Sequence, residues 1–360
     1  MSVEVRDPLR VAVVCWKPDD GIALVIGDEL RNLGYKLSFI DPNHKQIADV
    51  DFIFSFGPYG RFLKVPQLYS QVPPQDRPIM IHWNTEGIPD LRMPWSLVRF
   101  LSKLRSKYER LVESERSFLG KLLRQRPLSL LRTRFIRYLY VGDYYYAYNN
   151  GWLDVFSDSS SIYAKLHNQN NKLPTVVAAW GGTQRWYKGM SLERDIDVLW
   201  IGKRGSMRRS QLVDYVRDEL KKHNVNMYIA DGEENPFIFG DERTEYLNRS
   251  KITLNITRTW YDDNYSRFSM AAPNRSLVVS EPLLPHCEEY KEGVHYVSAP
   301  IEELPERILH YLKNEDAREQ IVENAYQLIT NELSFKKQID KIMQVALRKR
   351  EEKRTAIKSK

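Results

Sequence analysis

The stretch IDVLWIGKRGSMRRSQLVDYV, residues 196–216, carries most of the information about this chain. Residues 196–202 form an apolar run, interrupted by Asp197, that ends in glycine, which is typical of a buried strand. An amphipathic helix is predicted from about residue 208 to residue 223, and a short loop with a second glycine, Gly205, joins the two. Strand, glycine-containing loop and helix in this order are the repeating unit of an open α/β sheet.

Four cations lie in that loop and the first helical turn: Lys203, Arg204, Arg208 and Arg209. A cation in the first turn opposes the helix dipole. The cluster therefore suggests an external anion, because helix N-termini beside glycine-containing loops bind phosphate and the arginine fork suits it. The residues alone leave a second interpretation open, in which the turn is simply solvated or its arginines pair with neighbouring carboxylates.

The same alternation of strand and helix runs through the whole chain. Apolar strands are predicted at 10–16, 36–41, 50–57, 78–84 and 175–182, and again at 196–202, 226–232, 251–258 and 277–282. Buried strands separated by helices predict parallel sheets. We expect an α/β fold with a first domain over 1–185, a second over 186–345 and a basic tail over 346–360. Ligands of such sheets lie beyond the carboxyl ends of the strands.

Composition and charge narrow the class of protein. Of 360 residues, 42% are hydrophobic and 28% charged, which is a globular composition. There is no run of about 18 apolar residues and no signal-peptide pattern. The two cysteines, Cys15 and Cys287, fit a reducing compartment, so we expect a cytoplasmic protein. The net charge of +7 is unevenly distributed. Residues 92–137 hold 13 Lys/Arg against three Glu, and residues 348–360 hold seven Lys/Arg against two Glu. The rest of the chain therefore has a net charge of −8.

A basic helical hairpin is predicted as an insert over about 94–140. Its first helix places Leu97, Leu101, Leu104, Tyr108 and Leu111 along one face, with lysines and arginines around them. Such a helix can lie on an anionic membrane. The alternative, which we favour, is an ordinary domain helix with a solvated basic face. The tyrosines at 144–146 and 148 could stack on bases, but no nucleic-acid-binding motif accompanies them, so we expect no nucleic-acid partner.

The second half of the chain resembles the glycosyltransferase group 1 superfamily, in particular its divergent branch of spore-maturation-type glycosyltransferases. Residues 195–343 carry the resemblance. After the strand that ends in Gly202 come a strand with Asn255, an Arg-Phe pair that opens a helix, a "VVS" strand, a "GVHYV" strand and a terminal helix over AREQIVENAYQLITNELSF. The resemblance implies the GT-B architecture, two facing Rossmann-like domains with a basic helical insert in the first.

The resemblance also implies an activity and assigns residues to it. It implies transfer of a hexose from a UDP- or GDP-linked donor to an acceptor glycan or lipid-linked sugar, at the inner face of a membrane. Cations stabilise the departing diphosphate, so neither metal nor cofactor is expected. Lys203 and Arg208 are then catalytic, with His82 near the transferred sugar. The implied donor-binding residues are Gly21, Gly202, Arg209, Asn255, Arg267 and Ser269.

Three features depart from the family pattern, and one is the Asn274-Arg275 pair where a small Gly usually precedes the "VVS" strand. Many members open the Arg-Phe-type helix with a Glu that holds the donor ribose, whereas this chain has Ser269, and Tyr261 stands eight residues upstream. A serine accepts a ribose hydrogen bond more weakly than a carboxylate does. A second hypothesis therefore stays open, that of a catalytically inactive GT-B-like protein that binds a sugar or nucleotide.

Overall fold

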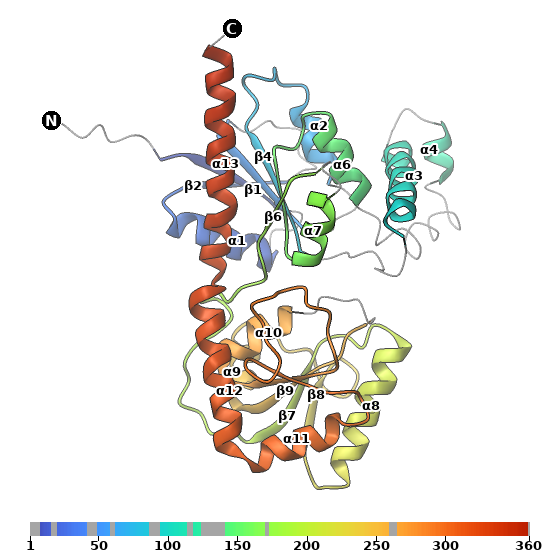
Figure 1. The fold of residues 1–360 in the computed structure, drawn as a ribbon, viewed down its shortest axis with the longest axis vertical. Coiled ribbons are helices and arrows are strands. Elements are labelled where there is room, and N and C mark those ends of the chain that lie inside the picture. Colours follow the sequence, from blue (N-terminus) through green and yellow to red (C-terminus); the bar gives the residue numbers. More distant parts are fainter. Residues whose placement is uncertain are drawn as a thin grey trace, which may run out of the picture. The chain divides into compact units, whose positions relative to one another are not determined.

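The structure is a computed structural model, which describes residues 8–15, 20–41, 49–57, 62–85, 94–113, 118–123, 141–169, 173–258 and 265–358. The chain divides into two compact units. The first comprises Met1–Ala178 and Ile339–Lys360, and the second comprises Ala179–Gln338. Each unit is built around a parallel sheet with helices beside it (Figure 1). Among the described helices, none has the length and apolar character needed to cross a membrane.

The first unit contains a six-stranded sheet in the order β2-β1-β3-β4-β5-β6. All five strand pairings are parallel. The strands are β1 (Arg10–Val14), β2 (Lys36–Ile40), β3 (Phe52–Phe56), β4 (Ile79–Asn84), β5 (Val155–Asp158) and β6 (Thr175–Val177). β3 and β4 are buried at every position, as expected of strands covered on both faces. The helices are α1 (Gly21–Asn32), α2 (Lys64–Tyr69), α3 (Trp95–Glu113), α4 (Phe118–Leu123), α6 (Val141–Asn149) and α7 (Ser161–Gln169).

The second unit contains a five-stranded parallel sheet in the order β11-β10-β9-β7-β8. The strands are β7 (Ile196–Ile201), β8 (Met227–Ala230), β9 (Ser250–Asn255), β10 (Leu277–Ser280) and β11 (Val297–Ser298). The helices are α8 (Met207–Lys221), α9 (Gly240–Arg249), α10 (Ser266–Ala271), α11 (Leu304–Lys313) and α12 (Glu315–Gln327). Two short helices, η1 (Ala272–Asn274) and η2 (Leu328–Glu332), and the long α13 (Phe335–Lys358) complete the chain. The strand order reverses between β7 and β9, which makes that point the topological switch of this sheet.

The predicted class, an α/β chain with two Rossmann-like parallel sheets, is confirmed. The unit boundary lies at 178/179 rather than at 185/186. Residues 183–195 form the irregular segment expected of a linker, but Asn274 and Asn248 attach it to the second unit. The Asn274 side chain donates to the Trp186 carbonyl at 2.8 Å and accepts from the Lys188 amide at 3.3 Å, and Asn248 accepts from the Met190 amide at 3.3 Å.

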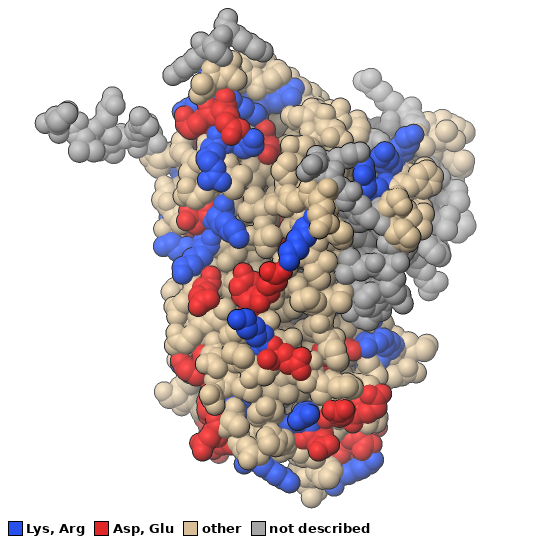
Figure 2. All heavy atoms as spheres, in the orientation of Figure 1, with Lys and Arg blue, Asp and Glu red and all other residues tan. Residues whose placement is uncertain are grey.

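The predicted basic tail over 346–360 is corrected, since most of it belongs to α13 and groups with the first unit. Arg350 pairs with Asp51 at 2.5 Å, and Lys353 pairs with Asp154 at 2.7 Å. These cations neutralise acidic side chains of the first unit. On the face drawn in Figure 2, Lys and Arg side chains are interspersed with Asp and Glu side chains and do not form a uniform basic surface.

The insert is helical where it is described, as α3 and α4 (Figure 1). Its predicted second helix falls within 124–140, outside the described residues. α3 packs against α6, with the Arg99 guanidinium 5.7 Å from the Tyr145 ring centre. The predicted apolar face is not uniformly covered, because Leu97 and Leu104 stay 42% and 48% exposed.

Candidate functional site

The loop after β7 places its side chains at the carboxyl edge of the second sheet. Gly202 has φ +119° and Gly205 has φ +70°, conformations that L side chains rarely adopt. Ser206 is the N-cap of α8, and its hydroxyl accepts from the Arg209 amide at 3.2 Å. The two glycines allow the chain to turn sharply from the strand into the helix. The predicted strand, glycine loop and helix are thus present.

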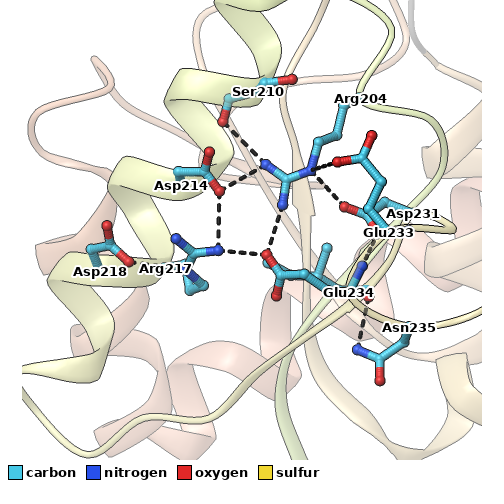
Figure 3. Close-up of polar contacts among 10 residues, drawn as sticks. Arg204, Ser210, Asp214, Arg217, Asp218, Asp231, Glu233, Glu234 and Asn235 are labelled. Carbon is cyan, nitrogen blue, oxygen red and sulfur yellow. Dashed lines mark hydrogen bonds and ion pairs between the residues drawn. The ribbon is translucent and has the colours of Figure 1, made fainter.

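Arg204 does not face an external anion. Its guanidinium donates to Asp231 at 2.5 Å, Asp214 at 2.7 Å and Glu234 at 2.7 Å (Figure 3). Its side chain is 9% exposed and that of Asp231 is fully buried. Burial alone would lower the pKa of Arg204, but the hydrogen bonds to Asp214 and Asp231 outweigh it and raise that pKa. Arg204 therefore joins α8 to the loop after β8, as in the alternative left open by the sequence.

Arg209 also has a structural position. It is 5% exposed, and its Nη1 donates to the Lys203 carbonyl at 3.0 Å. Its guanidinium lies 5.7 Å from the Trp200 ring centre. Arg209 thus holds the loop in place, and its predicted donor-binding role stays a prediction.

Lys203 and Arg208 differ from those two arginines in their exposure. The side chain of Lys203 is exposed and forms no hydrogen bond or ion pair with the residues that the structure describes. Arg208 is 42% exposed, but it forms a two-pronged ion pair with Glu281 and donates to the Thr257 carbonyl at 3.1 Å. Glu281 is 6% exposed and also accepts from the amide and hydroxyl of Thr257. Of the two predicted catalytic cations, one is thus unpartnered and the other is oriented by a buried carboxylate.

Arg267 spans the switch point of the sheet. Its Nε donates to the Ile201 carbonyl at 3.1 Å, at the end of β7, and its Nη1 donates to Asn255 Oδ1 at 3.0 Å, at the end of β9. The guanidinium lies 4.3 Å from the Trp200 ring centre. Arg267 therefore lies between the two strand ends where ligands of open α/β sheets bind, and its predicted contact with the donor stays a prediction.

Asn255 and Ser269 are both fully buried. The Asn255 amide donates to Ser280 at 3.0 Å, so this side chain connects β9 to β10 and positions Arg267. The Ser269 hydroxyl donates to the Tyr265 carbonyl of its own helix at 3.2 Å. Both side chains have internal hydrogen-bond partners, and their predicted contacts with the donor stay predictions.

A cavity of about 220 Å³ opens beside this loop. Ile201, Gly202, Ile238, Phe239, Arg243, Leu247, Thr253, Ser266, Arg267 and Met270 line it. Most of its walls are apolar, and the Phe239 side chain in the wall is 70% exposed. The cavity therefore suits a largely apolar group next to the glycine loop. Arg243 could not be predicted as a cavity residue, because its local sequence pattern is that of an ordinary surface arginine on a helix.

In the first unit, His82 lies in a sealed position. It is 1% exposed, its Nδ1 lies 2.9 Å from the Ser55 hydroxyl, and the rings of Phe62 and Tyr144 lie 4.4 and 4.6 Å away. The Ser55 hydroxyl donates to the Ile81 carbonyl at 2.9 Å, so it accepts from His82. Burial lowers the pKa of His82 to about 3. The predicted position near a transferred sugar is not supported, since the imidazole is neutral and packed inside the core.

Gly21 is exposed and begins α1, with Asp20 as the N-cap that accepts from the amides of Ile22 and Ala23. Its predicted contact with the donor stays a prediction.

A buried carboxyl that the sequence analysis missed lies at the ends of β4 and β5. Asp158 is 1% exposed, accepts from Asn84 at 2.9 Å and from the Ser160 amide at 2.8 Å, and lies 3.9 Å from His167 Nε2. Burial raises the pKa of Asp158 to about 7, although both hydrogen bonds oppose this shift. Asn84 in turn accepts from Tyr144 at 3.2 Å. All side chains of this network are buried, which is typical of a structural role.

Residues 208–344 match a family model described as "Glycosyl transferase-like". The match covers most of the second unit, from the first turn of α8 onward. The predicted resemblance to the group 1 superfamily is confirmed over this range, and the spore-maturation branch stays a prediction. No curated protein sequence matches the chain.

Solved structures place the whole chain in the GT-B fold. HepE of Anabaena, in complex with UDP, has a TM-score of 0.55 at 10% identity over 94% of this chain and 98% of its own. Sucrose-phosphate synthase from Thermosynechococcus elongatus has a TM-score of 0.52 at 10% identity over 98% and 100%. TarM has a TM-score of 0.52 at 11% identity over 90% of this chain, and the chain spans 58% of TarM's length. At these identities the likeness is one of fold.

No group of three or more His, Cys, Asp or Glu side chains is placed to hold a metal ion within the described ranges. The acidic side chains around Arg204 surround a guanidinium instead (Figure 3). Metal independence stays a prediction.

Proposed function

We propose that this chain is a glycosyltransferase that transfers a hexose from a UDP- or GDP-linked donor to an acceptor glycan or lipid-linked sugar, without a metal or cofactor. One observation carries the proposal: the glycine loop of residues 202–206 lies at the switch point of a glycosyltransferase-like unit, with an exposed lysine and a half-exposed arginine beside it. That is where this class of sheet binds phosphate-bearing ligands. HepE, which shares the fold, binds UDP and UDP-glucose.

The two cations supply the chemistry of the proposal. Breaking a sugar–diphosphate bond develops positive charge on the sugar and negative charge on the phosphates. Cations fixed beside the departing diphosphate stabilise the transition state more than the ground state. Lys203 supplies a free ammonium group. Arg208 has five N–H donors, and its bonds to Glu281 and Thr257 leave its Nε–H and one Nη2–H for a phosphate oxygen.

Calorimetry on the intact chain with GDP and UDP, followed by donor hydrolysis, tests the proposal. Lys203→Ala removes a charge-assisted contact, so affinity for both nucleotides should fall by on the order of tenfold to a hundredfold, with unchanged thermal stability. Lys222→Ala is the matched control, because Lys222 follows the other end of α8 and pairs with Glu219. Equal affinities of the Lys203→Ala variant and the native chain would contradict the proposal.

A second candidate function is nucleotide-sugar binding without turnover. The position where many superfamily members carry a ribose-binding Glu is Ser269 here, and that serine is buried and bonded to its own helix. Tight binding of a nucleoside diphosphate together with neither donor hydrolysis nor transfer would favour this candidate over the enzyme.

For localisation we propose a cytoplasmic protein that contacts the inner face of an anionic membrane through α3 and α4. Apolar side chains there are exposed beside exposed lysines: Leu97, Phe100, Leu104, Phe118, Leu119 and Leu122 with Lys103 and Lys107. Apolar groups among cations are what an anionic lipid surface binds. The intact chain should float with anionic vesicles and not with neutral ones, and Phe118→Ser with Leu119→Ser should abolish flotation. Flotation unaffected by lipid charge or by these substitutions would refute the contact.

A further inference from the structure

The cavity beside Gly202 contains a cation that has no partner among the described residues. Arg243 lies on α9 and lines the cavity, and its side chain forms no hydrogen bond or ion pair with any residue the structure describes. Its Nε is buried and unsatisfied. Burial lowers the pKa of Arg243, and no carboxylate in the described part of the chain opposes that shift. Every other arginine discussed for this unit, namely Arg204, Arg208, Arg209 and Arg267, has internal acceptors.

An unpaired, partly desolvated guanidinium is costly to the folded protein. Most of its neighbours in the cavity wall are apolar, and no hydrogen bond joins it to the two hydroxyl side chains of the wall, Thr253 and Ser266. Burial of an unmatched donor in an apolar cavity is the arrangement expected where a ligand supplies the missing acceptors. The ligand group must be largely apolar, and it must present acceptors to a planar fork.

The position of the cavity relates that group to the proposed donor. Gly202 and Arg267 belong both to the cavity wall and to the switch point where the proposed diphosphate binds. In a nucleoside diphosphate the group connected to the phosphates through one ribose is a nucleobase, which has flat apolar faces and polar edges. The exposed ring of Phe239 in the wall can stack on such a face.

We propose that Arg243 selects the nucleobase of the donor and favours guanine, so that the donor is GDP-linked. The inference rests on the proposed function. An arginine fork offers two parallel donors, and guanine presents two adjacent acceptors, N7 and O6. Adenine places a donor beside N7, and uracil has a donor between its two acceptors, so both meet the fork with one mismatched group. Cytosine has two adjacent acceptors at N3 and O2, but the larger purine fills more of a cavity of about 220 Å³.

Calorimetry on the intact chain with GDP, UDP, ADP and CDP tests the inference. GDP should bind on the order of tenfold to a hundredfold more tightly than UDP or ADP, which is the discrimination of one good two-pronged contact. Arg243→Met should abolish that preference by weakening GDP and leave UDP within about threefold. The variant should fold, because the substitution removes an unpaired cation. Phe239→Ala should weaken all four nucleotides alike, because stacking is tolerant of base identity.

The matched control is Arg249→Met, on the same helix, whose guanidinium pairs with Asp195 at 2.6 Å outside the cavity wall. It should leave all four affinities unchanged. Tighter binding of UDP, ADP or CDP than of GDP, or an equal loss of all four in Arg243→Met, would overturn the assignment of Arg243 alone. Failure of all four nucleotides to bind would overturn the donor site itself and this inference with it.

Discussion

Arg204→Met is predicted to destabilise the second unit far more than the same change at a neighbouring arginine. Arg204 is 9% exposed, and its Nε bonds to Oδ2 of the fully buried Asp231 (Figure 3). The other oxygen of Asp231 accepts two backbone amides, each at 2.8 Å. Loss of the guanidinium therefore leaves half of a buried carboxylate without a partner.

The magnitude follows from burial. Removing one partner of a buried ion pair costs about 3–5 kcal/mol, and the two remaining amide bonds put this case near about 3 kcal/mol. Arg217 belongs to the same cluster, but it is 32% exposed and its partners Asp214, Asp218 and Glu234 are 40%, 62% and 34% exposed. Arg217→Met should therefore cost at most about 1 kcal/mol.

Urea unfolding at pH 7, followed by tryptophan fluorescence, gives the free energy of unfolding of both variants, and a thermal melt gives their Tm. For a unit of this size, about 3 kcal/mol corresponds to a fall of roughly 6–12 °C in Tm. Adding Asp231→Asn to Arg204→Met should recover part of the loss, because it removes the unpaired charge. Equal destabilisation by Arg204→Met and Arg217→Met would refute the reasoning that burial gives this pair its strength.

Two further predictions concern the glycine loop and the first unit. Gly202→Ala should lower the free energy of unfolding by about 1–3 kcal/mol and weaken nucleotide binding, because φ is +119° there and the new Cβ would lie 3.3 Å from Arg267 Nη2. Unfolding curves measure the first effect and calorimetry the second. A variant with native stability and native affinity would contradict the idea of a strained loop. Asp158 has its folded-state pKa raised to about 7 by burial, so the native state holds an extra proton between about pH 4 and pH 7. The free energy of unfolding of the first unit should therefore fall by on the order of 2–4 kcal/mol as pH rises through that window. Asp158→Asn should flatten this dependence of stability on pH. An unchanged pH dependence in that variant would show that Asp158 is not its cause.

The elements were predictable from sequence because their signals are local. The apolar runs of β3, β4 and β7 and the glycine that ends β7 identify buried parallel strands without any knowledge of tertiary structure. The course of the last helix was not predictable. α13 appeared as a basic tail because its acidic partners, Asp51 and Asp154, lie some 200 to 300 residues away in the chain.

The candidate site was only partly predictable, for the same reason. The sequence located the loop, but it did not show which of its four cations pair with internal carboxylates. That depends on Asp231, which follows β8 and pairs with Arg204, and on Glu281, which follows β10 and pairs with Arg208. Arg243 carried no sequence signal, because an arginine without a partner is recognisable only when all of its neighbours are known.

The central claim is that the loop after β7 binds the diphosphate of a nucleotide donor. A crystal structure of the intact chain with GDP tests it most directly. We predict phosphate oxygens within hydrogen-bond distance of Lys203 Nζ, and the guanine ring in the cavity lined by Arg243 and Phe239. A diphosphate bound elsewhere, with Lys203 still in solvent and this loop without a ligand, would contradict the claim.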